Sequence, residues 1–149
     1  MEVYRISSAK YANKLQASGV ANRWNKEGEY VIYAAESRSL ATLEMVAHRN
    51  AIMSGQKFKL MTIAIPPNSK YYSHYQKKGL PKGWNSPKNK SALQNLGSDW
   101  YKANDSICLL VPSVIIPQEF NMVINTKHPD FSKVKLVKVE DYNWDERLL

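Results

Sequence analysis

The chain is poor in cysteine and in long apolar runs. Cys108 is the one cysteine among its 149 residues, so no disulfide bond can form within the chain. No stretch reaches the roughly 18 consecutive apolar residues that a membrane-spanning helix needs. Residues 1–19 are mixed and polar and lack the apolar segment of a secretory signal. We therefore expect a cytoplasmic protein that does not associate with membranes.

Several common functional motifs are also missing. The sequence contains no G-x-G-x-x-G, no Walker loop and no G-x-S-x-G, which argues against ordinary dinucleotide oxidoreductases, P-loop enzymes and α/β-hydrolases. His48, His74 and His128 lie far apart in the sequence, and no Cys/His spacing resembles a zinc site. Cys108 is flanked by Ile107 and Leu109 and is expected to be an inert buried thiol. We expect no bound metal.

Positive charge, by contrast, is plentiful. Lysine and arginine number 21 against 13 acidic residues, which gives a net charge of +8 and a pI of about 9.5. Such a balance favours anionic partners such as nucleotides, nucleic acid or an acidic protein. The lysines occur in scattered pairs rather than in one dense block, which is typical of solvated faces. A basic domain that binds nucleic acid remains an alternative.

The apolar pattern indicates a folded domain rich in strands. Hydrophobic residues make up 44% of the chain and aromatic residues 11%, enough for one domain spanning residues 1–149. A helix is expected in 36–52, and 67–99 should be irregular, with short helical pieces of which the last lies near 97–104. Strands are expected in 2–6, 29–35, 58–66, 107–117, the beginning of 120–131, and 133–142. Their irregular order predicts an α+β fold, with mostly antiparallel sheets and flanking helices.

The expected helix in 36–52 carries a carboxylate at the edge of its apolar face. Ser37 or Ser39 can cap its N-terminus. The apolar face is expected to consist of Leu40, Leu43, Val46 and Ala47, which follow one another at helical spacing. Glu44 lies one step beyond this arc, where a carboxylate can be partly desolvated without being stranded.

Four polar residues have both a structural and a functional interpretation. Arg23, beside Trp24, is either a surface arginine packed on an indole or a planar fork that binds phosphate. Tyr33 suits the core of a strand, and Glu44 suits a solvated helix face. Ser113 lies within the apolar run "VPSVIIP", so its hydroxyl needs either a backbone partner at the break in the strand or a cavity.

The ordered series of motifs goes further than composition. The series "YRI", "NRWNKEGEYVIYAAESRSLATLEMVAHR", "LPKGW", "LGSDWY", "LLVPSVIIPQEFNMVINTKHPDF" and "YNWDERLL" resembles the RES domain, the toxin half of bacterial RES–Xre toxin–antitoxin pairs. The resemblance covers residues 3–149. It implies a fold like that of the ADP-ribosyltransferases of the diphtheria-toxin type, acting on NAD as a substrate and needing no further cofactor.

The resemblance also implies roles for individual residues. The catalytic residues of the family fall on Glu44, Tyr33 and Arg23, and its NAD-binding residues fall on Arg23, Tyr33, Ser113, Arg5 and Asn121. Asn125 and His128 are weaker matches that are expected to support the pocket. The family usually has two glycines before its arginine, whereas this chain has Ala21 and Asn22, so the backbone path beside the phosphates is expected to differ.

The expected function is that of a growth-inhibiting toxin that cleaves the nicotinamide–ribose bond of NAD. The acceptor of the ribosyl group is water or inorganic phosphate. The alternative is a protein, which would make the chain a mono-ADP-ribosyltransferase. The resemblance further implies an Xre-type antitoxin as partner, with DNA contacted only through that partner. One form that such a complex could take contains a homodimer of the toxin.

Overall fold

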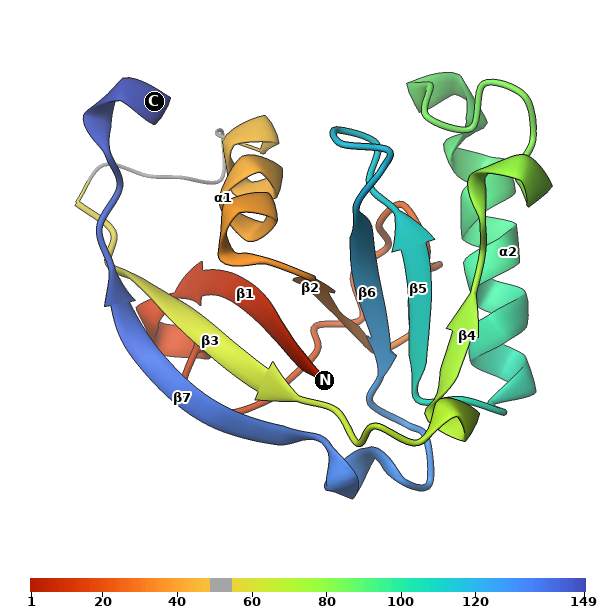
Figure 1. Cartoon of the computed structure of the whole chain (residues 1–149), viewed down its shortest axis with the longest axis horizontal. Coiled ribbons are helices and arrows are strands. Elements are labelled where there is room, and N and C mark those ends of the chain that lie inside the picture. Colours follow the sequence, from red (N-terminus) through yellow and green to blue (C-terminus); the bar gives the residue numbers. More distant parts are fainter. Residues whose placement is uncertain (49–54) are drawn as a thin grey trace.

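The structure, a computed structural model, describes residues 1–48 and 55–149 (Figure 1). The strands of this part of the chain form one seven-stranded sheet in the order β4-β5-β6-β2-β1-β3-β7, antiparallel throughout except for the parallel pair β4–β5. In chain order the strands and α-helices are β1 (Glu2–Ser8), β2 (Val31–Ala35), α1 (Arg38–Ala47), β3 (Phe58–Ala64), β4 (Tyr72–His74), α2 (Lys90–Ala103), β5 (Cys108–Pro112), β6 (Phe120–Asn125) and β7 (Lys135–Tyr142). The expected α+β fold with a mostly antiparallel sheet is confirmed.

The sheet opens between β1 and β2. These two strands pair at the single position Tyr4–Ala35, whereas β1 pairs with β3 along its whole length and β2 pairs with β6 along its whole length. Figure 1 shows β1 and β2 diverging from each other. The sheet therefore consists of two halves, β7-β3-β1 and β2-β6-β5-β4. Where they diverge, side chains of both halves can face a common space.

Each helix covers one half of the sheet. Leu40 of α1 is buried in an apolar cluster with Ile6 of β1, on the first half. Leu93 and Trp100 of α2 are buried in a second cluster with Leu109 of β5, on the other half. Burying such side chains is the main favourable contribution to the folding free energy. Both helices are thus firmly seated, α1 beside the opening in the sheet and α2 against β4 and β5 (Figure 1).

Within the apolar run of 107–117, the strand β5 is buried on both faces as predicted, but it covers only Cys108–Pro112. Cys108 belongs to one core cluster, whereas Leu109 and Val111 belong to another, so alternate side chains of β5 point to opposite faces of the sheet. The strand ends at Pro112, because proline cannot donate a hydrogen bond to the ladder.

The face by which α1 packs differs from the prediction. Leu40 and Ala41 are buried and Met45 packs against the same cluster, whereas Leu43 is 37% exposed and Ala47 is exposed. Ala41 is small, and its side of the helix can approach the sheet closely. The prediction placed the apolar face one residue too far around the helix. The last part of the predicted helix, residues 49–52, lies outside the described residues.

The stretch expected to be irregular contains more regular structure than predicted. Its short helical pieces are 3-10 turns at Ser69–Tyr71, Lys77–Gly79 and Pro87–Asn89. The three-residue strand β4 was not predicted, because it is stabilised by pairing with β5 rather than by its own sequence. The last helix, α2, begins at Lys90 rather than near 97, with Gly97 in its interior.

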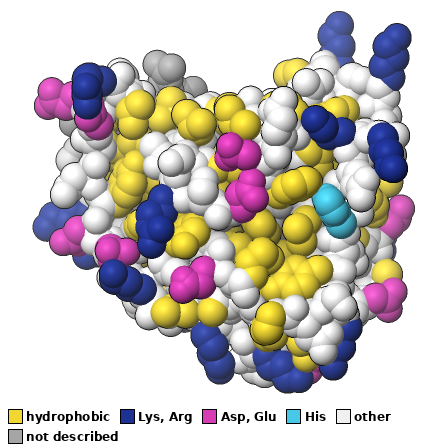
Figure 2. All heavy atoms as spheres, viewed as in Figure 1, with side chains coloured by type: hydrophobic (Ala, Val, Ile, Leu, Met, Phe, Trp, Pro, Cys, Tyr) yellow, Lys and Arg dark blue, Asp and Glu magenta, His cyan; other side chains and the backbone are white. Residues whose placement is uncertain are grey.

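On the face seen in Figure 2, Lys and Arg side chains are scattered around the rim, while apolar side chains gather toward the middle. None of the helices among the described residues has the length and hydrophobicity needed to cross a bilayer.

Candidate active site

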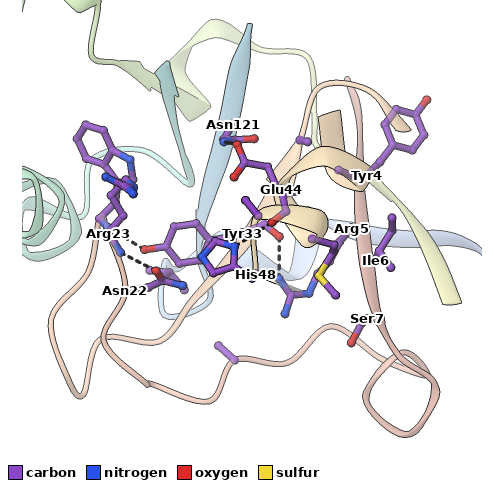
Figure 3. A pocket seen from close by; sticks show the side chains of 18 of the residues that line it. Tyr4, Arg5, Ile6, Ser7, Asn22, Arg23, Tyr33, Glu44, His48 and Asn121 are labelled. Carbon is purple, nitrogen blue, oxygen red and sulfur yellow. Dashed lines mark hydrogen bonds between the residues drawn. The ribbon is translucent and has the colours of Figure 1, made fainter. Parts of the chain in front are cut away.

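A cavity of about 760 Å³ opens where β1 and β2 diverge. Its size falls within the range of roughly 300–1,000 Å³ that is usual for ligand pockets. Five of the six predicted site residues line it: Arg5 of β1, Arg23 of the following loop, Tyr33 of β2, Glu44 of α1 and Asn121 of β6. In the view of Figure 3, Tyr33 and Glu44 lie between the two arginines. Residues far apart in the sequence are thus gathered around one space.

Glu44 is partly buried and held by two donors. Its Oε1 atom accepts hydrogen bonds from Ser113 Oγ at 2.9 Å and from Asn121 Nδ2 at 2.7 Å. Its Oε2 atom receives no hydrogen bond from the described residues. The carboxylate is therefore fixed through one oxygen, and its other oxygen is left for a ligand. Glu44 is partly buried, as expected, but around the helix it lies between the buried Leu40 and Ala41 rather than beyond the predicted apolar face.

Ser113 lies beneath Glu44 and does not line the cavity. Its side chain is 0% exposed. Besides donating to Glu44, its Oγ atom accepts hydrogen bonds from the backbone N–H groups of Ile115 and Ile116, both at 3.1 Å. The hydroxyl thus has a backbone partner at the break after Pro112 and also orients the carboxylate. In this structure Ser113 contacts Glu44 rather than the space that a ligand would fill.

Tyr33 joins β2 to the loop that carries Arg23. Its hydroxyl donates to Asn25 Oδ1 at 2.6 Å and accepts from the backbone N–H of Trp24 at 3.0 Å. Burial raises the pKa of the Tyr33 phenol well above its ordinary value, with a smaller contribution from the negative charge of Glu29. The phenol is neutral at physiological pH, so Tyr33 offers the cavity a ring and not a proton acceptor.

Two guanidinium groups give the cavity positive charge. Arg23 Nη1 is buried and has no hydrogen-bond partner among the described residues, and Arg5 Nη1 donates to the carbonyl oxygen of Tyr33 at 2.8 Å. Burial lowers the pKa of Arg5, which means that the site penalises an unpaired cation. Within the described part of the chain, no carboxylate forms an ion pair with either arginine. An anionic ligand would relieve both groups.

Asn121 has an unused acceptor beside the carboxylate. While its Nδ2 atom donates to Glu44, its Oδ1 atom is buried and has no hydrogen-bond partner among the described residues. A buried acceptor without a partner is costly, and a ligand that donates a hydrogen bond would remove the cost.

Two residues that were expected to support the pocket do not line it, and one residue that was not predicted does. Asn125 and His128, expected to support the pocket, do not line it. Asn125 instead donates to Asn104, and His128 accepts from the N–H of Asp130. Asn125 is the last residue of β6 and His128 lies beyond it, whereas Asn121, near the start of the strand, lines the cavity. His48, just after α1, does line the cavity, with its Nδ1 atom 2.8 Å from the carbonyl oxygen of Glu44. The sequence signal that could have identified His48 is its spacing of four residues from Glu44, which places the two side chains on one face of a helix.

The arrangement suits an anionic ligand that develops positive charge. Two arginines can bind phosphate groups, a fixed carboxylate can stabilise a cation, and a tyrosine ring lies between them. Within residues 1–48 and 55–149, no three His, Cys, Asp or Glu side chains gather in a way that would hold a metal ion.

Comparison with known proteins places the chain in a family. It is 35% identical over 142 residues to the "Prs ADP-ribosylating toxin" of Sphingobium sp., covering 93% of this chain and 88% of that protein. It is 34% identical over 154 residues to "Toxin Res" of Photorhabdus laumondii subsp. laumondii, covering 100% and 97%.

Its fold also resembles a chain of the crystal structure of the M. tuberculosis MbcT-MbcA toxin–antitoxin complex. The TM-score is 0.77 at 18% identity, covering 95% of this chain and 84% of that chain, a likeness of fold alone. The sequence profile described as "RES domain" matches residues 2–145. The cavity between the diverging strands thus lies within a chain that belongs to the RES domain family.

Proposed function

We propose that this chain is the toxin of a toxin–antitoxin pair and that it cleaves the nicotinamide–ribose bond of NAD. Relatives that share 34% and 35% of its residues over nearly the whole chain are named toxins, and one of them is named as ADP-ribosylating. The observation that carries the proposal is that Arg23, Tyr33 and Glu44 line a single cavity in which the carboxylate of Glu44 is held by two donors.

The bond to be broken joins a ribose carbon to a cationic nicotinamide nitrogen. When it breaks, its electron pair stays with nicotinamide, which leaves as a neutral molecule, and the ribose becomes oxocarbenium-like. The enzyme must therefore stabilise positive charge that develops on the sugar. A carboxylate near the sugar does this through its charge and through hydrogen bonds to the hydroxyl groups, as in glycosidases.

Glu44 is the carboxylate proposed for this task. Ser113 and Asn121 hold its Oε1 atom, so Oε2 can accept hydrogen bonds from the ribose hydroxyls. Partial burial strengthens its field, because Coulomb energy rises as the effective dielectric constant falls. We assign Ser113 the role of orienting Glu44, whereas direct hydrogen bonding of Ser113 to NAD stays a prediction.

The remaining residues of the cavity would bind and orient NAD. Arg23, whose Nη1 atom is buried without a partner in the described part of the chain, would bind the pyrophosphate, and Arg5 would add positive charge on the side of β1. The ring of Tyr33 would pack on nicotinamide. Asn121 would accept a hydrogen bond at Oδ1, which has no partner within residues 1–48 and 55–149, from the carboxamide or from a ribose hydroxyl.

The acceptor of the ribosyl group is water or inorganic phosphate in this proposal. In either case an oxygen of the acceptor forms the new bond to the ribose carbon; water then releases a proton to solvent, whereas hydrogen phosphate attacks through an oxygen that carries no proton. Incubating the purified protein with NAD, with and without phosphate, and separating the products by chromatography would identify the acceptor. We expect release of nicotinamide together with ADP-ribose or its phosphorylated form. NAD that stays intact under every condition, including in the presence of cell extract, would refute the enzyme.

Protein ADP-ribosylation is a second candidate. It is favoured by the name of the relative in Sphingobium, "Prs ADP-ribosylating toxin", which shares 35% identity with this chain. The first step would be the same, but a protein side chain would receive the ribosyl group. NAD labelled in its adenine would distinguish the two reactions. Label retained on a protein after denaturation and washing indicates transfer, whereas label found only in small molecules indicates hydrolysis or phosphorolysis.

An antitoxin is the proposed protein partner. The fold neighbour comes from a toxin–antitoxin complex, and the RES resemblance implies an Xre-type antitoxin that would cover the cavity and carry any contact with DNA. Because the substrate is NAD, we expect the toxin to act in the cytoplasm. Co-expression with the product of the neighbouring open reading frame tests this. We expect the growth defect to disappear and the two proteins to co-purify, with the mass of the complex reporting whether it contains a toxin homodimer.

A further inference from the structure

The loop that carries Arg23 is held from behind by helix α2. Gln94 of α2 donates from Nε2 to the carbonyl oxygen of Asn22 at 2.9 Å. One turn further along, Ser98 donates from Oγ to Glu29 Oε2 at 2.6 Å, and Glu29 Oε1 in turn accepts from the N–H of Lys26 at 2.7 Å. Hydrogen bonds from one helix thus reach both ends of the loop.

Between these two contacts, helix and loop meet backbone to backbone at Gly97. A Cβ atom placed on Gly97 would overlap the carbonyl oxygen of Trp24 and lie 2.6 Å from its carbonyl carbon. Real Cβ atoms essentially never come within 3.0 Å of such atoms. Gly97 is buried in the interior of α2, where glycine costs about 1 kcal/mol relative to alanine. This cost is explained by the close approach that only glycine permits.

The inside of the loop connects directly to the catalytic tyrosine. Asn25, which is 1% exposed, donates from Nδ2 to the carbonyl oxygens of Val20, Lys26 and Glu29 and accepts the hydroxyl proton of Tyr33. The N–H of Trp24 donates back to the Tyr33 hydroxyl. A displacement of the Trp24 main chain would therefore alter both the placement of Arg23 and the hydrogen bonds of Tyr33.

We infer that Gly97 and Ser98 are positioning residues, which set the place of Arg23 and Tyr33 in the cavity through the loop between them. The inference rests on the proposed function, because it assigns these residues a role in binding NAD. Neither residue lines the cavity. Trp24 is buried in the same cluster as Leu93 and Trp100, so a Cβ atom on Gly97 cannot be accommodated without moving the Trp24 main chain relative to α2.

Gly97→Ala tests the inference, with Asn95→Ala as its control. Both changes place alanine on α2, but Asn95 is exposed, so its replacement adds helix propensity without contact with the loop. We expect Gly97→Ala to raise KM for NAD about tenfold or more, within the roughly hundredfold that a 1 Å misplacement can cost. At saturating NAD, the turnover of Gly97→Ala should be close to that of the wild type, so kcat should change little. An unchanged KM would overturn the inference.

A second pair of variants tests the inference independently, in case Gly97→Ala fails to fold. Ser98→Ala removes the hydroxyl that donates to Glu29, whereas Ser91→Ala is the same change at an exposed position near the start of α2. We expect Ser98→Ala to raise KM and Ser91→Ala to leave it unchanged. Equal kinetics of the two variants would contradict the role of Ser98.

Hydrogen–deuterium exchange separates this inference from the proposed function, because it needs no NAD. In Gly97→Ala and Ser98→Ala, peptides covering residues 19–28 should exchange faster than in the controls, while β5 and β6 keep their protection. Faster exchange in a protein whose wild type does not consume NAD would refute the proposed function but leave α2 as the support of the loop. Unchanged exchange in both variants would overturn the inference itself.

Discussion

At the scale of the residue, Glu44 is held in a way that a solvated helix glutamate is not. Its Oε1 atom takes a hydrogen bond from the fully buried Ser113 and another from Asn121. Neither donor is a cation, so the negative charge of the carboxylate is oriented without being neutralised by an ion pair. Such an arrangement favours stabilisation of a positive charge that appears in the ligand.

We expect Glu44→Gln to remove most NAD turnover while leaving the fold intact. The amide oxygen of glutamine can still accept from Ser113 and Asn121, but the charge that stabilises the oxocarbenium-like ribose is lost. Loss of such a group typically lowers kcat about 100-fold or more. Chromatography of NAD and thermal unfolding measure the two effects. Glu2→Gln, at an exposed position of β1, is the control. Normal turnover in Glu44→Gln would contradict its assignment.

The pH dependence of stability tests the burial of Tyr33. Because its pKa is raised in the folded state, the unfolded chain releases the phenolic proton first as the pH rises. Its contribution to the free energy of unfolding is therefore complete below about pH 10, the ordinary value, and is lost above it. Tyr33→Phe should lose about 1–3 kcal/mol at neutral pH, since the N–H of Trp24 and Oδ1 of Asn25 lose their partner.

Above pH 10, the variant Tyr33→Phe should lose stability less steeply than the wild type does. Urea unfolding at several pH values between 8 and 11 measures both effects. Tyr11→Phe, at a side chain that is 53% exposed, should behave as the wild type at every pH. Parallel curves for Tyr33→Phe and the wild type would show that the phenol titrates alike in the folded and unfolded states.

At the scale of the element, α1 begins where its sequence predicts but turns a different side to the sheet. Of the two serines that can cap it, Ser37 does so, accepting from the N–H of Leu40 at 3.0 Å. Because the cap fixes the residue at which the helix starts, it also fixes the position of Glu44 along the helix. The orientation of the helix about its axis was set by contact of Leu40 and Ala41 with the sheet, which no local pattern reports.

Ser37→Ala should lower the free energy of unfolding by about 1 kcal/mol, because the N–H of Leu40 loses its partner. Ser39→Ala, at an exposed position in the first turn of the helix, should be neutral or slightly stabilising, since alanine has a higher helix propensity than serine. Urea unfolding of both variants measures the difference. Equal destabilisation of the two would show that Ser37 does not act as the cap.

At the scale of the whole molecule, the divergence of β1 and β2 creates the site. A fully paired sheet would place their backbones side by side and leave no space between them. Because the pairing is reduced to Tyr4–Ala35, the side chain of Arg5 reaches across to the carbonyl oxygen of Tyr33, and the cavity forms beneath α1. The chain, with its net charge of +8, holds at this site two arginines that form no ion pair with a carboxylate of the described residues, which favours the approach of an anionic ligand.

We expect this charge to give only weak and nonspecific attraction for DNA. Basic side chains are scattered on the face seen in Figure 2, rather than gathered in a stripe. Fluorescence anisotropy with a DNA duplex should give a Kd no tighter than about 10⁻⁶ M at physiological salt, the range of nonspecific binding. Tight binding that persists at that salt concentration would favour the alternative of a nucleic-acid-binding domain.

Much of the fold could be read from local patterns. Alternating and apolar runs located β1, β2, β3, β5, β6 and β7, and the serine cap located the start of α1, because these preferences act over a few neighbouring residues. The strand β4 and the first half of α2 were missed. The first is held by its pairing with β5, and the second lies in a polar stretch interrupted by a glycine whose reason is a distant contact with Trp24.

The sequence by itself determined six of the seven described strands and the start of α1, that the fold is α+β, and, through its ordered motifs, that Arg23, Tyr33 and Glu44 belong together. Only the tertiary structure decided how they act together: Ser113 lies beneath Glu44, and α2 holds the loop of Arg23. Each of these contacts joins residues 69 positions apart, as in Ser113–Glu44 and Ser98–Glu29. Local preference has no reach over such separations, so the packing of the two halves of the sheet and their helices had to bring these side chains together.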